Sequence, residues 1–394
     1  MPRLLVVNVY FSPNSFGGAT VVAEEMAQHL ASEHGWSVGG FTSMRAPGLP
    51  DFSIRRYRAR GADVVAVNLP PGFTYLEEYC SPRVKARFAE VVDAFAPDVV
   101  HIHCVQTLGA DLLDVVVERG LPLAVTLHDC WWLCERQFMI DRHGQYCFQR
   151  KISPDRCRYC VDDHAASRLR AHFLSEQLRK ADLLLYPSAF HRDLHVANGL
   201  PADRSVVNKN GVRPPGPGYR RRSTGGKPVF GFIGGPGAIK GGDVLVRALR
   251  LLGRDDVHLR VVDAAQNIGT SWQSDSYWDV PAQVEHVPAY TQETIDEFFC
   301  SIDVLLFPSQ WKESFGLTVR EALLRDVWVI ATDAGGAAED LRDGENATLI
   351  PLDGQHAPLA RAIAACMERE DWPMYVAPGK SEITTIAMLS LIHI

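Results

Sequence analysis

The sequence lacks any apolar run long enough to cross a membrane, since no stretch approaches about 18 uninterrupted apolar residues. It also lacks an excess of positive charge. The 40 basic and 47 acidic residues give a formal net charge of −7, which argues against a general nucleic-acid binder. Nine cysteines among 394 residues do not make a disulfide scaffold. The whole chain is 46% hydrophobic and 22% charged, which is typical of a globular protein of one or two domains.

The first residues, Met1–Tyr10, hold only a short apolar run and no small-residue cleavage site. They predict a buried first strand in place of a signal peptide, and hence a cytoplasmic protein.

Short β-rich runs alternate with helical patterns along the chain, which favours parallel sheets. The proline- and glycine-rich segment Val206–Gly218 interrupts this alternation and marks a boundary. We therefore expect an α/β protein with two Rossmann-like doubly wound domains that face each other across a cleft, at residues 1–210 and 211–372. The expected strands are Leu4–Tyr10, Trp36–Thr42, Asp98–His103, Leu123–Leu127, Asp182–Tyr186, Val229–Ile233, His258–Val262, Val284–Val287, Val304–Phe307 and Val327–Thr332, and helices are expected at Thr20–Ser32 and Pro82–Phe95.

Residues 373–394 form a separate terminal segment. We expect Trp372–Met388 to be the beginning of an incomplete last helix. The final residues, Leu389–Ile394, match one reading frame of a transposase sequencing adaptor, so we expect a tail of sequencing origin; a genuine apolar tail is the alternative.

Two glutamates, Glu313 and Glu321, flank seven residues between two strand candidates. The spacing leaves room for one helix, so Glu313 falls in the loop at the first strand's carboxyl end and Glu321 falls within the helix. Ligands of open α/β sheets bind at this edge. Because carboxylates accept hydrogen bonds from hydroxyl groups, the pair predicts a polyhydroxylated ligand.

Two glycine-bearing loops follow strand candidates. Gly17 and Gly18 open a helix whose free N–H groups suit an anion, although a plain turn explains them equally well. In the second half, Gly234 and Gly235 head a glycine-rich loop that leads to a single lysine, Lys240. The spacing fits neither a Walker loop nor a dinucleotide fingerprint. Open backbone and one point charge nevertheless suit a diphosphate, and the alternative is a flexible loop with a solvated lysine.

Histidines end two strand candidates of the first half: His101 and His103 end one, and His128, followed by Asp129, ends the next. These polar ends would share one sheet edge, so we expect His128 to contact a ligand, with a structural role as the alternative. Zinc is not expected here, because the sequence places no third ligand.

Taken together, these motifs resemble the family 4 glycosyltransferases, which are retaining enzymes of the GT-B fold that use nucleotide-sugar donors. The resemblance covers nearly the whole chain and is most specific over Glu313–Leu323 and Val329–Gly336. It implies that Glu321 binds the donor ribose and that Glu313 lies near the transferred sugar. It further implies that the backbone of Phe315, Gly316 and Leu317 holds the diphosphate with Lys240, that His128 contacts the donor sugar, and that Gly17, Gly18, Gly234 and Gly235 approach the donor. The implied catalytic residues are Lys240, Glu313 and His128.

Two positions depart from the family pattern. Gly235 stands where relatives often have an arginine on the diphosphate, which leaves more of that charge to Lys240. Arg325-Asp326 stands where many relatives carry glycine and proline, and we expect altered packing there with the chemistry intact.

A cysteine-rich insertion is expected at about residues 130–165. Its four cysteines, Cys134, Cys147, Cys157 and Cys160, end in a Cys-x2-Cys pair. Four thiolates at this spacing suit a structural zinc ion that would stabilise a segment without strong hydrophobic periodicity. Reduced thiols, or a redox disulfide between Cys157 and Cys160, are the alternatives.

The expected function is retaining sugar transfer from a nucleotide-diphosphate sugar to a glycan or lipid-linked acceptor in surface polysaccharide biosynthesis. No cofactor is expected for catalysis. A sugar-nucleotide epimerase and a non-catalytic nucleotide-sugar binding protein are the alternatives. The basic stretches Ser81–Arg87 and Ser167–Phe173 could touch the inner face of a membrane, or form solvated helix faces.

Overall fold

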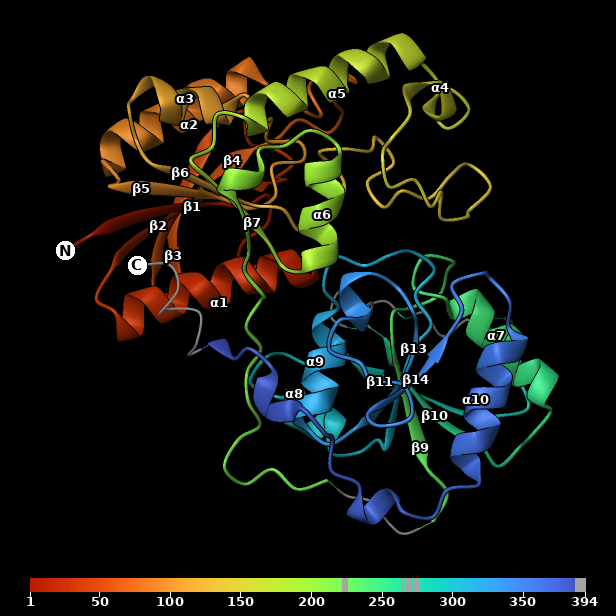
Figure 1. Cartoon of the computed structure of the whole chain (residues 1–394). Helices are drawn as coiled ribbons and strands as arrows, with labels where there is room; N and C mark the ends of the chain where they lie inside the picture. The colour runs from red at the N-terminus through yellow and green to blue at the C-terminus, as the bar shows by residue number, and fades with distance from the viewer. Residues whose placement is uncertain (222–225, 264–265, 267–270, 272–276, 387–394) are drawn as a thin grey trace. The chain divides into compact units, whose positions relative to one another are not determined.

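The structure is a computed structural model that describes residues 1–221, 226–263, 266, 271 and 277–386 (Figure 1). The described chain divides into two compact units. Unit 1 comprises Met1–Met139, Phe148–Gly211 and Ile386, and unit 2 comprises Ile140–Cys147 and Val212–Thr385. The division at Gly211 lies beside the expected boundary at 210.

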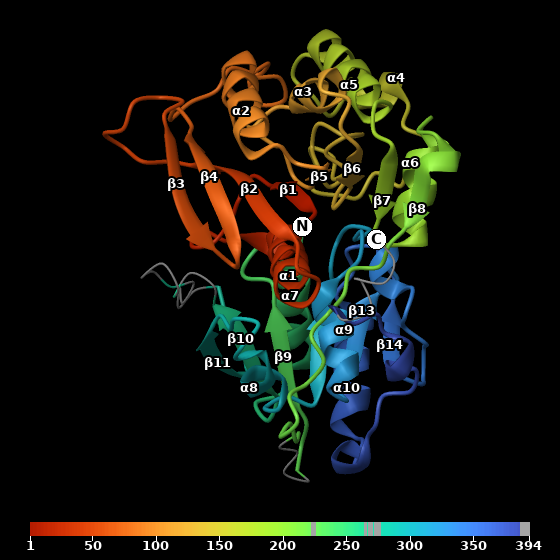
Figure 2. The same ribbon diagram turned by 90° about the vertical axis from the view of Figure 1, so that its left-hand side faces the viewer.

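Unit 1 is built on a sheet of eight described strands in the order β3-β4-β2-β1-β5-β6-β7-β8. Neighbouring strands run parallel, except that β3 and β4 form an antiparallel hairpin at one edge (Figure 2). Apolar side chains of α2, α3 and α5 pack on one face of the sheet, and those of α1 pack on the other. The elements are β1 (Arg3–Val7), α1 (Gly17–Glu33), β2 (Ser37–Met44), β3 (Ile54–Ala59), β4 (Ala62–Asn68), α2 (Pro82–Phe95), β5 (Val99–Ile102), α3 (Leu112–Glu118), β6 (Leu123–Thr126), α4 (Pro154–Cys157), α5 (His164–Leu178), β7 (Leu183–Tyr186), α6 (Ala189–Ala197), η1 (Ala202–Arg204) and β8 (Ser205–Val207).

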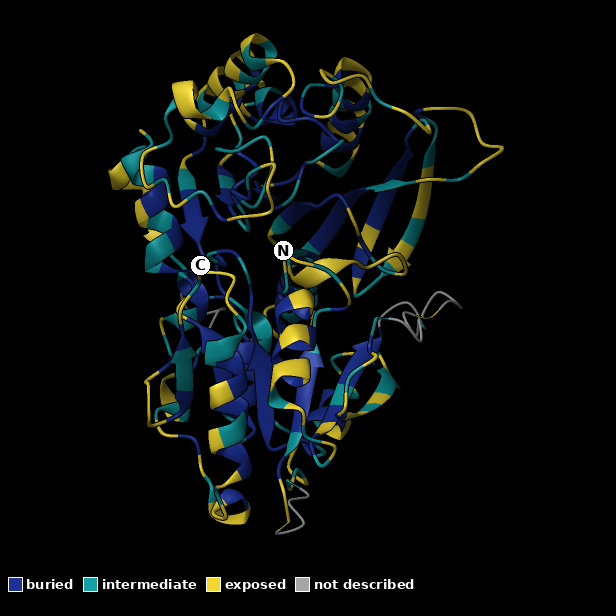
Figure 3. Cartoon of the chain, turned by 90° about the vertical axis from the view of Figure 1, so that its right-hand side faces the viewer, coloured by how far each residue is buried: buried dark blue, intermediate teal, exposed yellow. Residues whose placement is uncertain are grey.

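Unit 2 has a parallel sheet of six described strands in the order β11-β10-β9-β12-β13-β14. Side chains of α7 and α10 pack on one face, and those of α8 and α9 pack on the other. In both units, buried colour runs along the central strands and exposed colour lies on the outer faces of the helices (Figure 3). The elements are β9 (Val229–Ile233), α7 (Gly242–Leu252), β10 (His258–Asp263), β11 (Gln283–Pro288), α8 (Ile295–Phe299), β12 (Val304–Phe307), α9 (Leu317–Leu324), β13 (Trp328–Thr332), η3 (Gly336–Ala338), β14 (Ala347–Ile350), α10 (Ala357–Met367), η4 (Trp372–Met374) and η5 (Lys380–Glu382).

Helix α2 shows how the sequence sets an element. Pro82 occupies the first turn, where a missing N–H costs nothing. Val84, Phe88, Val91 and Val92 recur at helical spacing and are all buried. The helix begins and ends at the residues expected from this pattern.

Two parallel-sheet α/β domains confirm the expected fold class. Each strand expected from the sequence is present, with ends shifted by a few residues. Four strands, β3, β4, β8 and β14, are not among the expected strands. Strand β3 is a polar arginine-rich segment, and β8 and β14 are short, whereas β4 is a largely apolar run that the sequence analysis leaves out.

The helix expected over Trp372–Met388 is wrong for its described part. Two short 3-10 turns, η4 and η5, occupy this segment up to Ile386. Pro373 and Pro378 explain the difference, since proline removes the backbone donor that helical bonding needs. Residues 387–394, including the tail attributed to sequencing, lie outside the described residues.

Within the described part of the chain, no helix combines the length and apolar character that a membrane span requires. The basic stretches Ser81–Arg87 and Ser167–Phe173 lie at the start of α2 and within α5. Arg170 departs from the solvated face expected of the second stretch, because its side chain is buried and donates to the Trp131 carbonyl at 2.9 Å.

Candidate functional site

A polar cluster of unit 2 joins the loop after β9 to the loop after β12. The Lys240 Nζ atom lies 2.7 Å from the Glu313 Oε1 atom. The hydroxyl group of Ser309 donates to the same oxygen at 2.8 Å. The Glu313 side chain is 8% exposed while that of Lys240 is 41% exposed, so a buried carboxylate holds an ammonium group that remains open to solvent.

Gly241 makes this close approach of the two loops possible. Its φ of +79° suits glycine, and a Cβ atom there would lie 1.9 Å from the Pro308 carbonyl oxygen. The Gln310 amide also donates to the Ile239 carbonyl at 2.8 Å, so the two loops are joined through backbone as well as side chains.

The segment Phe315–Leu317 begins α9 next to Glu313. Gly316 has a φ of +79°, and α9 starts at the following residue with its first N–H groups lacking helical partners. Such a helix start favours negative charge. The sequence-based placement of this segment at a helix start is therefore confirmed.

Arg320 holds the backbone of this region through hydrogen bonds to three carbonyl groups. Its guanidinium group donates to the carbonyls of Phe315, Gly336 and Ala337 and pairs with Asp340 at 2.7 Å. The Arg320 side chain is only 1% exposed. One buried cation therefore holds together the loop before α9 and the η3 segment.

Glu321 lies within α9, as expected, but it is buried. Burial raises the pKa of this carboxyl group to about 7, against the opposing effects of Arg325, Gln292 and Tyr290. Burial therefore favours the protonated form of Glu321, which the sequence could not predict.

The glycine-rich loop after β9 has a further support in Tyr277. Its hydroxyl group accepts from the Gly237 amide at 3.0 Å and donates to Asp243 at 2.8 Å. The pKa of Tyr277 is raised to about 12, mainly by burial. This phenol therefore orders the loop that Gly234 and Gly235 begin.

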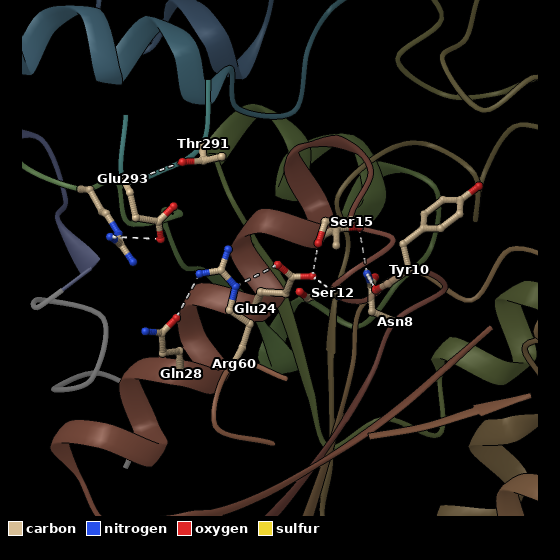
Figure 4. A network of polar contacts seen from close by, with 11 residues as sticks. Asn8, Tyr10, Ser12, Ser15, Glu24, Gln28, Arg60, Thr291 and Glu293 are labelled. Atoms are coloured by element: carbon tan, nitrogen blue, oxygen red, sulfur yellow. Dashed lines mark hydrogen bonds and ion pairs between the residues drawn. The ribbon is translucent and has the colours of Figure 1, made fainter. Parts of the chain in front are cut away.

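Unit 1 presents Gly17 and Gly18 at the start of α1, and both residues are exposed. The loop before them is anchored by Glu24, which accepts from the Ser12 amide at 2.6 Å and from the Ser15 hydroxyl group at 2.5 Å (Figure 4). Arg60 lies 3.8 Å from the same carboxylate. Burial nevertheless raises the pKa of Glu24.

Polar side chains follow β5 and β6 at the same edge of the unit 1 sheet. The His103 Nδ1 and His128 Nε2 atoms are 2.8 Å apart, and the two rings stack with centroids at 5.1 Å. Desolvation lowers the pKa of His128 to about 4 and that of His103 well below its usual range. Both imidazoles are therefore neutral at neutral pH, and the expected neighbourhood of His103 and His128 is confirmed.

The remaining polar groups at this edge are also held. His101 bonds Thr126 at 2.7 Å, and Asp129 accepts from the Gln137 amide group at 2.6 Å. The His103 Nε2 atom is buried and has no hydrogen-bond partner in the part of the chain that the structure describes.

The four cysteines of the expected insertion lie in the segment between β6 and α5. Among the described residues, no three side chains of His, Cys, Asp or Glu gather in an arrangement that could hold a metal ion. Cys147 is grouped with unit 2, whereas Cys134, Cys157 and Cys160 belong to unit 1. Zinc binding by these thiols stays a prediction.

Arg325 and Asp326, where we expect packing that differs from the family pattern, are both held by ion pairs, and the difference from relatives stays a prediction. Arg325 is buried and pairs with Asp296 at 2.6 Å. Asp326 takes a φ of +58° and binds Lys380 at 2.8 Å. Aspartate is among the residues that tolerate this left-handed conformation.

Sequence reasoning missed four residues of these networks, namely Ser309, Tyr277, Arg320 and Glu24. A charged residue at an inward-facing helical position was a usable signal for Arg320 and Glu24. No local pattern marks Ser309 or Tyr277.

Comparisons with known proteins decide the family. Residues 16–214 match the family model described as Glycosyltransferase Family 4, and residues 220–381 match the model described as Glycosyl transferases group 1. The chain is a family 4 glycosyltransferase. Its fold is the GT-B fold expected from the resemblance.

Curated relatives match this glycosyltransferase over short regions. The D-inositol 3-phosphate glycosyltransferase of Nocardia farcinica is 33% identical over 134 residues, which are 32% of this chain and 30% of the relative. The phosphatidyl-myo-inositol mannosyltransferase of Mycobacterium tuberculosis is 36% identical over 87 residues, which are 21% of this chain and 23% of the relative. The chain therefore matches about a third or less of these relatives' length.

Solved structures match the glycosyltransferase along its whole length. Anabaena HepE, in complex with UDP and glucose, has a TM-score of 0.67 and 17% identity, covering 100% of this chain and 98% of HepE. Sucrose-phosphate synthase from Thermosynechococcus elongatus has a TM-score of 0.71 and 17% identity, covering 100% of this chain and 97% of that enzyme. At this identity the likeness shows the fold alone.

Proposed function

We propose that this glycosyltransferase is a retaining enzyme that transfers a sugar from a nucleotide-diphosphate sugar to a glycan or lipid-linked acceptor, in surface polysaccharide biosynthesis. The observation that carries the proposal is the contact between the Lys240 Nζ and Glu313 Oε1 atoms. It lies where the loops after β9 and β12 meet, at the edge where open α/β sheets bind ligands.

Charge development in the reaction explains why these groups suit it. As the bond from the anomeric carbon to the diphosphate oxygen breaks, negative charge grows on the leaving group. Lys240 and the start of α9 would stabilise that charge. Glu313 would accept hydrogen bonds from hydroxyl groups of the sugar, and Glu321 from those of the ribose.

Retention calls for attack on the same face that the diphosphate leaves. The acceptor oxygen would bond to the anomeric carbon there, and its proton would pass to the leaving phosphate. The neutral ring of His128 would contact the donor sugar without placing a positive charge beside the oxocarbenium-like centre. HepE, which was solved with UDP and glucose, supports a nucleotide-sugar donor by likeness of fold.

A panel of nucleotide-diphosphate sugars, tested with and without glycan and lipid-linked acceptors, tests this function. Nucleotide release that requires an acceptor, with retained anomeric configuration in the product, is the expected result. An isomerised donor without acceptor would indicate an epimerase. Tight donor binding without turnover would indicate a non-catalytic binding protein, which the glycine at position 235 favours because it removes a cation from the diphosphate site.

The proposal requires no cofactor for catalysis. Structural zinc at Cys134, Cys147, Cys157 and Cys160 is a separate proposal, supported by the cysteine spacing alone. Metal analysis of the purified chain tests it, and a clearly substoichiometric zinc content would refute it. The proposed place of action is the cytoplasm, at the inner face of the membrane where a lipid-linked acceptor would be met.

A further inference from the structure

A surface hollow of about 440 Å³ lies in unit 1, away from the loops described above. The pairing of residues across neighbouring strands shows which face of the sheet forms the bottom of this hollow. Arg58 pairs with Asp63, Asp63 with Gly39, and Gly39 with Leu5, so one rung crosses β3, β4, β2 and β1. Residues paired directly across strands share a face, and Leu5 belongs to the core beneath α2. Leu5 is in the middle of β1, whereas the loop to Gly17 follows the strand's carboxyl end.

Gly39 allows the end of α2 to come down onto the sheet. A Cβ atom at Gly39 would lie 2.9 Å from the Phe95 ring, so the aromatic ring rests where a side chain would otherwise stand. Val65 and Val91 line the same hollow. The hollow therefore has an apolar body formed by three strands, β1, β2 and β4, and by helix α2.

Arginines surround this apolar body. Arg3, Arg56 and Arg58 line the hollow, and Asp63 is the acidic residue among its lining. Arg58 pairs with Asp63 at 3.1 Å, but both side chains are largely exposed, so the pair is weak. Positive charge is thus in local excess on a chain whose net charge is −7.

Two of these arginines have unused donors. The Arg3 guanidinium group lies 4.6 Å above the Phe95 ring and donates to the Phe95 carbonyl, yet its Nε atom is buried without a partner among the described residues. The Arg56 side chain is exposed and makes no ion pair or hydrogen bond within the described part of the chain. A buried donor without an acceptor is uncommon in proteins and calls for a partner.

We propose that this hollow binds a small amphipathic anion of the alkyl phosphate class. The alkyl chain would lie against Leu5 and Phe95, and the phosphate would accept from the exposed guanidinium group of Arg56, with the positive charge of Arg3 at the same hollow. Guanidinium groups form their strongest hydrogen bonds with such oxyanions. The volume lies within the range of about 300–1,000 Å³ that is usual for small-molecule sites. This site is separate from the proposed donor site and does not depend on it.

Octyl phosphate is a suitable probe, and its binding to the full chain can be measured by titration calorimetry below its micellar concentration. Arg56→Glu should weaken binding by about tenfold or more, because it removes a charged hydrogen bond and adds repulsion. Arg55→Glu is the matched control. Arg55 is the next residue of β3, pairs with Ala66 and points to the other face, so its substitution should leave the affinity unchanged.

Several outcomes would overturn the proposal: no heat of binding with octyl phosphate, equal affinity for octanol, or equal weakening by the two glutamate variants. Vesicles of phosphatidylglycerol, compared with phosphatidylcholine vesicles, identify the source of the phosphate. Arg56-dependent vesicle binding would assign a membrane headgroup, and binding of the monomeric probe alone would assign a soluble ligand. Because neither measurement needs a sugar donor, failure here would leave the proposed transferase function untouched.

Discussion

At the scale of single residues, Lys240 combines a fixed position with an open ammonium group. Lys240→Ala should lower turnover of a nucleotide-sugar donor by roughly 10²–10³-fold, because one preorganised charge at the leaving group is lost. Chemical denaturation checks the folded state, because the substitution leaves the buried Glu313 carboxylate without its counter-charge. Steady-state kinetics measure the effect.

Lys227→Ala is the control for Lys240→Ala. Lys227 is a more exposed lysine of the same unit that pairs with Asp256. Equal activity of the two variants would remove Lys240 from the mechanism.

Glu321 gives a pH-dependent prediction. Its folded-state pKa is raised from 4.5 to about 7, so the stabilising effect of the protonated form is complete below pH 4.5 and is lost as pH rises through 7. We compare the unfolding free energy of the unchanged chain with that of Glu321→Gln. The unchanged chain should lose about 3 kcal/mol relative to this variant between pH 4.5 and pH 8. Urea unfolding of both chains at several pH values measures this difference, and a pH-independent difference would contradict it.

At the scale of elements, the ion pair between Arg320 and Asp340 secures the start of α9. Asp340→Asn would leave a buried guanidinium group without its counter-charge, so we expect a loss of about 3–5 kcal/mol in unfolding free energy. Chemical denaturation measures the loss. Glu382→Gln breaks the exposed pair with Arg342 and should cost about 0–1 kcal/mol. Similar losses in both variants would show that the buried pair contributes no more to the unfolding free energy than an exposed pair.

The loop that precedes α1 depends on one buried carboxylate. Glu24→Ala removes the acceptor of the Ser12 amide, so hydrogen exchange at Ser12 should become about tenfold faster or more. Glu24→Gln keeps an acceptor and should restore part of the protection. Glu33→Ala, at the far end of the same helix, should leave the loop unchanged. Unaltered exchange in Glu24→Ala would mean that the backbone alone holds the loop.

At the scale of the whole molecule, each unit has its own hydrophobic core. Phe299→Ala removes a fully buried ring from unit 2 and should cost about 3–5 kcal/mol. Because units with separate cores can unfold separately, hydrogen-exchange protection should fall in β12 and β13 while that of β1 and β5 persists. A uniform loss across both units would show that the chain unfolds as one.

The sequence predicts most of the architecture, because buried parallel strands such as Val304–Phe307 are unbroken apolar runs. It also places Glu313 and Lys240 in the correct loops. It does not predict β3, since an edge strand can carry arginine on both faces. Nor does it predict the burial of Glu321, because the side chains that enclose it come from distant segments, such as Tyr290. Contacts of this kind depend on how elements pack, which local pattern does not contain.

The arginine-rich strand β3 has a consequence for how copies of this chain behave in concentrated solution. An open sheet edge offers unpaired backbone groups to any other extended segment, and this is a common start of aggregation. Here the edge carries Arg55, Arg56 and Arg58, so two such edges repel each other before their backbones can pair. The opposite edge, β8, is only three residues long and offers little to a partner. The charge of β3 and the shortness of β8 therefore limit aggregation through the edges of this sheet. Neutralising these arginines should make the protein prone to self-association.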